Sequence, residues 1–353
     1  MSTGGGLLLF SGGLDSILAG RVVMAQGIRV VAVKFVSPFF NYAVLKEPEN
    51  YQQSIKEKYD IDVLVEDIST AYMEILHHPA HGFGKNFNPC IDCKILMLKR
   101  AKEMMAELGC SFLITGEVLG QRPMSQRRDT LNVIERDSDS RSILLRPLSA
   151  RLMRETTAES EGLIDRQRLL DFSGRGRSRQ IALAHQFGIT DFPSPAGGCI
   201  LADPILSKRI ERLFGGEFVI PAEKITIPDI LFLLVGRQFL LPGGGWLILG
   251  RDEKENERLV RMAGREDVVL EMEERPGPTA VLRHGPDRNQ DPQEQERDLS
   301  ASAGLVVRYG KKVKSGPKGC RVEVTRGGTT QGLFADPLAD EQFRDWMLFL
   351  KHS

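Results

Sequence analysis

The sequence has few cysteines, few aromatic residues and no long apolar run. Five cysteines occur among 353 residues, and aromatic residues make up 7% of the chain. The longest apolar stretch, 230–241, is interrupted by Gly236 and Arg237 and is too short to span a bilayer. Residues 1–6 are uncharged and glycine-rich, unlike the charged start of a secretory signal. We therefore expect a soluble protein of the reducing cytoplasm with no membrane partner.

An excess of charge of either sign is also missing. The chain has 47 Lys and Arg and 47 Asp and Glu, so its overall charge does not indicate a polyanionic partner. Basic residues are nevertheless concentrated in residues 121–180 and 305–326. A length of 353 residues is too great for one ordinary domain, and the character of the sequence changes near residue 214. We predict two domains, residues 1–213 and 214–353.

Short apolar runs alternate with helical patterns in the first of these domains. Strands are expected at residues 7–10, 30–35, 62–65 and 112–115, and helices at 15–26, 51–59 and 93–108. This alternation predicts an α/β fold with a Rossmann-like parallel sheet, helices on both faces, and the loops after residues 10, 35 and 115 on one edge. The second domain is predicted to be smaller and α+β, with strands at 246–250, 267–272, 306–307 and 320–325, a mobile loop at 283–302 and a terminal helix at 341–350.

A glycine–serine turn links the first expected strand to the first expected helix. It reads Ser11, Gly12, Gly13, Leu14, Asp15, Ser16. At such a turn, unpaired amides and the helix dipole attract an anion, and the glycines let the backbone approach it closely. The serines add hydroxyl donors, while Asp15 is suited to orienting a loop amide or holding Mg²⁺. No Gly-Lys-Ser/Thr follows, which excludes the common P-loop, and a plain strand–turn–helix cap is the structural alternative.

This turn resembles the SGGxDS pyrophosphate loop of the ATP pyrophosphatases. Those enzymes cleave ATP between the α and β phosphates, so the resemblance implies adenylation, with ATP and Mg²⁺ as cofactors. It also implies the adenine nucleotide alpha hydrolase-like form of the fold, with Asp15 as a catalytic candidate. The expected nucleotide-binding residues are Ser11, Gly12, Gly13, Leu14, Asp15, Ser16, Phe35, Gly116 and Gln121.

Three of the five cysteines are candidates for chemistry. Cys90 and Cys93 stand at the expected start of a helix, whose N-terminus favours thiolates. Cys199 follows two glycines that free the backbone beside its thiol. Cys110 opens an apolar strand and Cys320 lies in the second domain, so both are predicted to be structural.

Together with the pyrophosphate loop, these cysteines resemble those of the tRNA thiolation enzymes, which include the tRNA 2-thiouridylases and the cluster-dependent tRNA thiolases. The segments 115–121 and 145–148 resemble the tRNA 4-thiouridine synthetase. The resemblance covers roughly residues 5–212. It implies an ATP-dependent tRNA sulfurtransferase that adenylates a base carbonyl and replaces its oxygen with sulfur.

The resemblance leaves the form of the sulfur carrier open. Cys90, Cys93 and Cys199 would ligate three irons of a 4Fe–4S cluster, which the three-thiol pattern favours, or would carry a persulfide and resolve it as a disulfide. Zinc is a further alternative, with a fourth ligand from one of the nearby histidines, His77, His78 or His81. The sulfur would come from a cysteine desulfurase, a carrier protein or free sulfide. The nearby Lys85 is a candidate for a phosphate contact.

Basic segments are candidates for binding tRNA, because phosphate contacts dominate nucleic-acid affinity. Residues 250–256, 277–281 and 306–325 resemble the RNA-binding domain of NFACT proteins. Because the chain begins almost at its pyrophosphate loop, we expect the second domain to capture the RNA. The candidates are Arg122, Arg175, Arg177, Arg179, Lys311, Lys312 and Lys314, with Tyr309, Lys318 and Arg321 on the same surface, and a solvated charged surface is the alternative.

Two other functions stay open from the sequence. One is an adenylating enzyme that acts on a small molecule, against which the basic second domain counts. The other is a non-catalytic RNA-binding protein with a vestigial nucleotide site, against which the intact SGGLDS turn and the three cysteines count.

Overall fold

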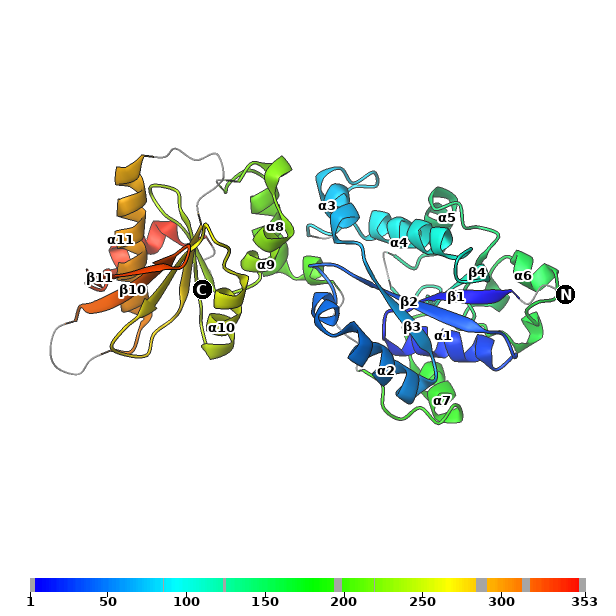
Figure 1. Cartoon of the computed structure of the whole chain (residues 1–353). Helices are drawn as coiled ribbons and strands as arrows, with labels where there is room; N and C mark the ends of the chain where they lie inside the picture. Colours follow the sequence, from blue (N-terminus) through cyan, green and yellow to red (C-terminus); the bar gives the residue numbers. More distant parts are fainter. Residues whose placement is uncertain are drawn as a thin grey trace. The chain divides into compact units, whose positions relative to one another are not determined.

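The chain forms two compact units, residues 1–202 and 203–353 (Figure 1). The computed structural model describes residues 4–84, 86–122, 125–193, 199–218, 220–283, 291–312 and 318–348. The division falls earlier than the composition change near residue 214, because α8 (Pro204–Phe214) packs on α9 (Ile227–Leu233) and so belongs to the second unit. No helix in these described ranges is long and apolar enough to cross a membrane.

The first unit is built on a parallel five-stranded sheet, as predicted. The strand order is β3-β2-β1-β4-β5. The strands are β1 (Gly5–Leu9), β2 (Val30–Val36), β3 (Asp62–Asp67), β4 (Cys110–Thr115) and β5 (Leu144–Leu145). Figure 1 shows α3, α4 and α5 on one face of the sheet and α1, α2 and α7 on the other. The helices are α1 (Leu14–Met24), α2 (Pro48–Tyr59), α3 (Ser69–His77), α4 (Cys90–Met104), α5 (Arg128–Asp137), α6 (Thr157–Ser160) and α7 (Ser178–Gln186).

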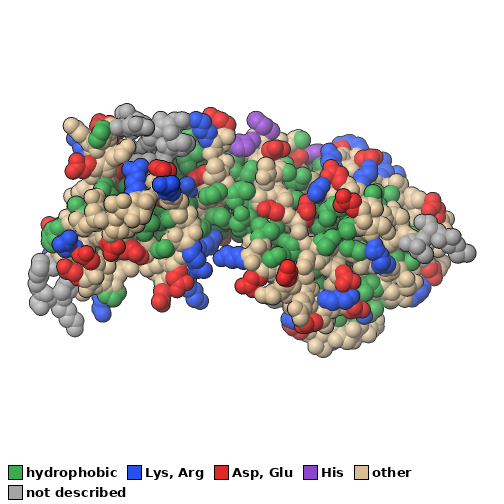
Figure 2. Space-filling view, in the orientation of Figure 1, with side chains coloured by type: hydrophobic (Ala, Val, Ile, Leu, Met, Phe, Trp, Pro, Cys, Tyr) green, Lys and Arg blue, Asp and Glu red, His purple; other side chains and the backbone are tan. Residues whose placement is uncertain are grey.

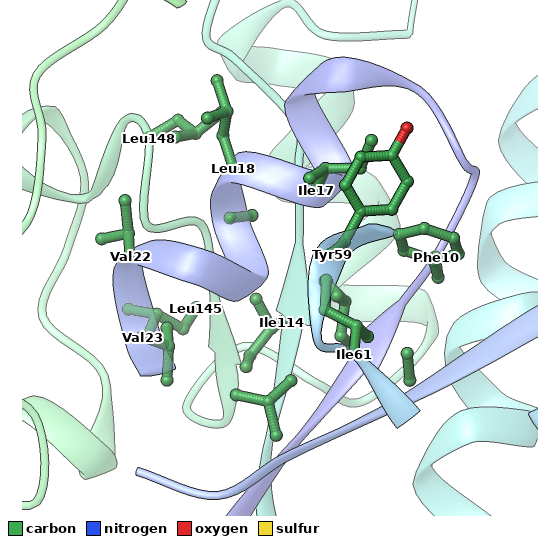
Figure 3. Close-up of a cluster of buried hydrophobic side chains, with 14 of the residues drawn as sticks. Phe10, Ile17, Leu18, Val22, Val23, Tyr59, Ile61, Ile114, Leu145 and Leu148 are labelled. Atoms are coloured by element: carbon green, nitrogen blue, oxygen red, sulfur yellow. The ribbon is translucent and has the colours of Figure 1, made fainter. Parts of the chain in front are cut away.

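Helix α1 is held against the sheet by a fully buried apolar cluster (Figure 3). Ile17 and Leu18 have no exposed surface, and neither has Ile114 of β4. Burying a side chain of this size contributes about 1.5–3 kcal/mol, so the cluster fixes the position of the helix. The N-terminus of α1 is thereby held at the end of β1, where the glycine–serine turn lies.

The second unit is α+β, with a six-stranded antiparallel sheet in the order β11-β10-β8-β9-β7-β6. Its strands are β6 (Arg237–Leu240), β7 (Trp246–Leu249), β8 (Val268–Met272), β9 (Ala280–Arg283), β10 (Cys320–Arg326) and β11 (Thr329–Ala335). Besides α8 and α9 it has α10 (Glu253–Met262), α11 (Pro292–Tyr309) and α12 (Asp340–Phe343). Helix α11 packs along β8, β9, β10 and β11.

Three sequence predictions for this unit differ from the structure. The expected strand at 306–307 and much of the expected loop at 283–302 form the single helix α11. Asp291 caps that helix by accepting a hydrogen bond from the amide of Gln293, and Pro292 occupies its first turn. Val306 and Val307 are buried against the sheet, so packing overrides the β propensity of a valine pair. The expected terminal helix is also short, since α12 ends at Phe343.

Candidate nucleotide and thiol site

The glycine–serine turn and the segment after β4 meet at the carboxyl edge of the parallel sheet, as the sequence predicted. Gly116 follows β4, and a Cβ atom there would lie 2.5 Å from the backbone of Asp15 and from the amide nitrogen of Ser16. No side chain fits at that distance, so only glycine allows the two segments to touch. The contact explains the glycine and places the residues after β4 beside the turn.

Hydrogen bonds within the turn hold it open toward an anion. The Ser11 hydroxyl donates to Ser16 Oγ over 3.1 Å, and the Ser16 hydroxyl donates to the Gly13 carbonyl over 2.8 Å. Gly12 has φ +84°, a left-handed conformation that favours glycine. No side chain caps the N-terminus of α1. Its first amides therefore face outward with the positive end of the helix dipole, which is the arrangement that binds phosphate.

The side chains of Gln121 and Lys34 contact this turn, whereas that of Phe35, which was expected to bind the nucleotide, is buried. Gln121 donates a hydrogen bond from Nε2 to Asp15 Oδ2 over 2.9 Å, so it lies beside the turn. Lys34 of β2 donates from Nζ to the Ser11 carbonyl oxygen and lies 5.7 Å from the centre of the Tyr51 ring. Burial lowers the pKa of Lys34 to about 8. The Phe35 side chain is buried, so it adds no open surface to the site.

Sequence reasoning missed Lys34, although a signal was present. A lysine stands inside the otherwise apolar run of β2, and only 3% of it is exposed. A lysine is almost never buried without a partner for its charge. An isolated lysine in a predicted buried strand, next to a predicted phosphate loop, is therefore a candidate for a phosphate contact.

The three candidate thiols surround one buried tyrosine, Tyr72 of α3. A hydrogen bond with its hydroxyl lowers the pKa of both Cys93 and Cys199, and the charge of each of the three thiolates raises the pKa of Tyr72. Cys90 and Cys93 occupy the first turn of α4, and the Cys199 sulfur lies 3.9 Å from the Phe39 carbonyl oxygen. The sequence did not single out Tyr72, because a tyrosine in an amphipathic helix is usually a core residue.

Burial raises the pKa of all three thiols, contrary to the expectation that the helix N-terminus would favour thiolates. The pKa of Cys93 is raised to about 12 and that of Cys199 to about 11, chiefly by burial. Burial also raises the pKa of Cys90, although the positive charges of Lys94 and Arg122 lower it in part. Removal from water outweighs the helix dipole, so the free thiols are protonated at neutral pH.

The donor set has the chemistry of a soft metal site. Three cysteine sulfurs are the ligands typical of zinc and of iron–sulfur clusters. Among the residues that the structure describes, no three His, Cys, Asp or Glu side chains are placed to hold a metal ion. Both ring nitrogens of His81 are engaged by carboxylates, Nδ1 with Asp92 at 2.8 Å and Nε2 with Asp137 at 2.9 Å. His81 is therefore not available as the fourth zinc ligand, while Lys85 lies outside the described residues.

The interaction of His81 with Asp92 and Asp137, here called the His81 clasp, gives a pH-dependent prediction. Hydrogen bonds and charge from Asp92 and Asp137 raise the pKa of His81 above 6.5. The clasp therefore stabilises the fold fully below pH 6.5, and its contribution is lost as the pH rises through the higher value in the folded protein. An NMR titration of the imidazole should have its midpoint above 6.5, and Asp137→Asn should lower that midpoint. A midpoint unchanged by Asp137→Asn would contradict the clasp.

A buried ionic network joins the thiol helix to the segment after β4. Glu117 contacts Lys94 of α4 at 3.0 Å and Arg146 at 3.0 Å, and Arg146 also pairs with Glu135 of α5. Burial alone would raise the pKa of Glu117, but the two cations lower it to about 2. The carboxylate is therefore charged, and it ties α4 to the same sheet edge as the glycine–serine turn.

The arginines proposed to bind RNA occupy four different environments. Arg122 is exposed, and its positive charge lowers the pKa of Cys90. Arg175 is exposed. Arg177 lies 3.3 Å from Asp15, so it faces the glycine–serine turn. Arg179 pairs with Asp171 and stacks on Phe172 at 4.3 Å.

The basic candidates of the second unit also differ among themselves. Lys311 and Lys312 are exposed after α11, whereas Lys314 lies outside the described residues. The Tyr309 ring is partly buried, packs against Phe239 and Phe343, and has the Arg237 guanidinium 4.7 Å from its centre. Figure 2 shows acidic side chains interspersed with the basic ones on the face that it displays.

The parallel sheet with helices on both faces, and the glycine–serine turn at its carboxyl edge, define the first unit as a Rossmann-like α/β domain. Residues 1–154 match the family model described as Thiamine biosynthesis protein (ThiI). Residues 236–347 match the model of the NFACT protein RNA binding domain. The resemblance drawn from the motifs is confirmed for these two parts of the chain.

Individual known proteins are similar over parts of the chain. A Lysinibacillus sphaericus protein named "Probable tRNA sulfurtransferase" is 29% identical over 147 residues, which cover 42% of this chain and 35% of that protein. The chain thus spans about a third of the length of this relative. A 4-thiouridine synthetase, solved with RNA and ATP, matches 52% of this chain and 50% of its own, with 22% identity and a TM-score of 0.34. The U34-tRNA thiolase NcsA from Methanococcus maripaludis, solved with its 4Fe–4S cluster, matches 64% of this chain and 71% of its own, with 16% identity and a TM-score of 0.32.

Proposed function

We propose that this protein is an ATP-dependent tRNA sulfurtransferase of the cytoplasm, with residues 1–213 as its catalytic part and residues 214–353 as its RNA-binding part. One observation carries the proposal. The glycine–serine turn and the candidate thiols are linked at a single sheet edge. Gln121 donates a hydrogen bond to Asp15, and the positive charge of the adjacent Arg122 lowers the pKa of Cys90. A phosphate site and a sulfur site so joined suit a reaction in which ATP activates an atom that sulfur then replaces.

The chemistry has two steps. A base carbonyl oxygen attacks the α-phosphorus of ATP, an O–P bond forms, and pyrophosphate leaves. A sulfur nucleophile then forms a C–S bond at the same carbon while the C–O bond breaks, and the oxygen departs with AMP. The turn and Lys34 would bind the phosphates, and Asp15 would hold Mg²⁺.

The three thiols would carry the sulfur in one of two forms. As a persulfide, the terminal sulfur attacks the activated base, and a second thiol then attacks the cysteine sulfur, releasing the thiolated base and leaving a disulfide. Alternatively, Cys90, Cys93 and Cys199 would hold a 4Fe–4S cluster, which when bound supplies an iron site for sulfide. The match to tRNA sulfurtransferases and the NFACT-like second unit support tRNA as the acceptor.

The test combines a reaction and a spectrum. Anaerobically purified protein is incubated with tRNA, ATP and Mg²⁺, either with sulfide or with a cysteine desulfurase, L-cysteine and a dithiol reductant. The desulfurase supplies the oxidised sulfur of a persulfide, and the dithiol reduces the disulfide after each turnover. The tRNA nucleosides are analysed by mass spectrometry. We expect thiouridine that depends on ATP and protein, with AMP and pyrophosphate as co-products. A broad visible absorbance band would identify the cluster form. Active protein without this band would identify the persulfide form. AMP formation without any thionucleoside would overturn the proposal.

A further inference from the structure

The segment that contains Arg177 is attached to the nucleotide edge of the sheet. The Gly174 amide donates to the Leu119 carbonyl over 2.8 Å, and Ser173 forms a β-bridge with Leu119. Leu119 lies two residues before Gln121, which itself bonds to Asp15. The glycine-rich arginine segment is therefore anchored beside the glycine–serine turn. Helix α7 begins directly after it, at Ser178.

Arg177 reaches the acidic residue of that turn directly. Its Nη2 atom lies 3.3 Å from Asp15 Oδ2, which also accepts the hydrogen bond from Gln121. The two side chains of the ion pair are 23% and 21% exposed, so water screens their interaction only in part. Arg177 thus supplies a positive charge at the position where a polyphosphate with a bound cation would lie.

Three polar atoms of this cluster are buried without a hydrogen-bond partner among the described residues. They are Asp15 Oδ1, Gln121 Oε1 and Arg177 Nε. A buried polar atom left unpaired costs about 1–3 kcal/mol, so such atoms call for a ligand. Two of the three are oxygen acceptors, which suit a hard divalent cation, and the third is an N–H donor, which suits a phosphate oxygen.

A second cation faces the turn from β2. Lys34 is 3% exposed, and its ammonium group contacts the Ser11 carbonyl oxygen and the Tyr51 ring. Its ammonium group and the Arg177 guanidinium contact different residues of the turn, Ser11 and Asp15. An anion in the turn would therefore be approached by two cations, one from a strand and one from the arginine segment.

We infer that Arg177 binds the polyphosphate of ATP and does not bind RNA. In the free protein it neutralises Asp15, and when ATP arrives with Mg²⁺ its Nε–H and Nη groups turn to a phosphate oxygen as the cation takes its place at Asp15. This inference rests on the proposed function for the identity of ATP as ligand. The neighbouring arginines differ, since Arg175 is exposed and Arg179 is held by Asp171.

Binding measurements on the full chain test this assignment. Calorimetric titrations with Mg²⁺–ATP and with Mg²⁺–pyrophosphate compare the wild type with Arg177→Met, Arg177→Lys and the control Arg175→Met. Loss of a charged hydrogen bond predicts that Arg177→Met weakens both ligands roughly 10- to 100-fold, with Arg177→Lys intermediate. AMP affinity, and tRNA affinity measured without ATP, should stay at the wild-type value in Arg177→Met. Arg175→Met should leave both Mg²⁺-bound ligands unaffected.

The outcomes separate this inference from the proposed function. Wild-type ATP affinity in Arg177→Met, or loss of its tRNA affinity in the absence of ATP, would overturn the role of Arg177 even if the protein thiolates tRNA. A protein that binds ATP through Arg177 but forms no thionucleoside would overturn the proposed reaction and leave the role of Arg177 standing. A wild type that binds neither ligand would overturn both.

Discussion

Replacement of Cys199 by alanine is expected to abolish tRNA thiolation while leaving ATP binding unchanged. The Cys199 sulfur shares the Tyr72 hydroxyl with Cys93, whereas the glycine–serine turn lies between β1 and α1. Loss of a residue that takes part in the covalent chemistry lowers turnover by at least about 1000-fold. Thionucleoside formation and ATP affinity, measured on the same preparation, check the two parts of this expectation.

The chain offers matched controls for this substitution. Cys110 is buried in β4, and Cys320 is buried in β10 of the second unit. Alanine at either position should retain thiolation, with only the modest loss of stability expected when a small apolar side chain is shortened. If Cys199→Ala thiolates tRNA as well as these controls do, the three-thiol site is wrong.

Arg146→Met is expected to lower the free energy of unfolding by about 3–5 kcal/mol, the usual cost of breaking a buried ion pair. The Arg146 side chain is 1% exposed and pairs with Glu117, which is 4% exposed. Methionine would leave the Glu117 carboxylate buried with Lys94 as its remaining cation. Urea unfolding followed by circular dichroism measures the loss. The exposed Arg127, paired with Asp129 at 2.9 Å, is the control, and Arg127→Met should have little effect.

Acid should reduce the difference between Arg146→Met and the wild type. The network lowers the pKa of Glu117 from 4.5 to about 2. Its stabilisation is therefore present above pH 4.5 and is lost as the pH falls toward 2. Adding Glu117→Gln to Arg146→Met should also recover part of the lost stability, because the orphaned charge is removed. A double variant no more stable than the single one would show that Glu117 is not the source of the loss.

Local patterns were sufficient for the parallel sheet and its binding edge. Strands β1, β2 and β4 are short, mostly buried runs that the sequence displays directly. Strand β3 lies at the edge of the sheet and is largely exposed or half-buried. Parallel strands bring their carboxyl ends to one edge whatever the side chains. The helix α11 could not be predicted in this way. Val306 and Val307 have strand propensity, and only their burial against the second sheet makes them helical.

The candidate site likewise has features that the sequence shows and features that only the tertiary structure shows. The turn from Ser11 to Ser16 and the three cysteines are recognisable one by one, because glycine, serine and thiol groups carry their chemistry locally. The partners of Arg177 and Lys34 are not recognisable in the same way, since a charged residue in a sequence shows no partner, although the place of Lys34 in an apolar run does mark it as unusual. Their contacts with Asp15 and Ser11 join positions far apart in the chain.

The amino-acid sequence by itself determined the fold class of both units, and it indicated the glycine–serine turn and the set of candidate thiols. The tertiary structure alone decided which charged side chains contact that turn and whether the thiols are protonated. Burial is the physical reason in both cases. It raises the pKa of Cys93 to about 12 and lowers that of Lys34 to about 8, and it leaves Asp15 Oδ1 without a hydrogen-bond partner among the described residues. Burial depends on what the rest of the chain packs around each group, and no local pattern contains that information.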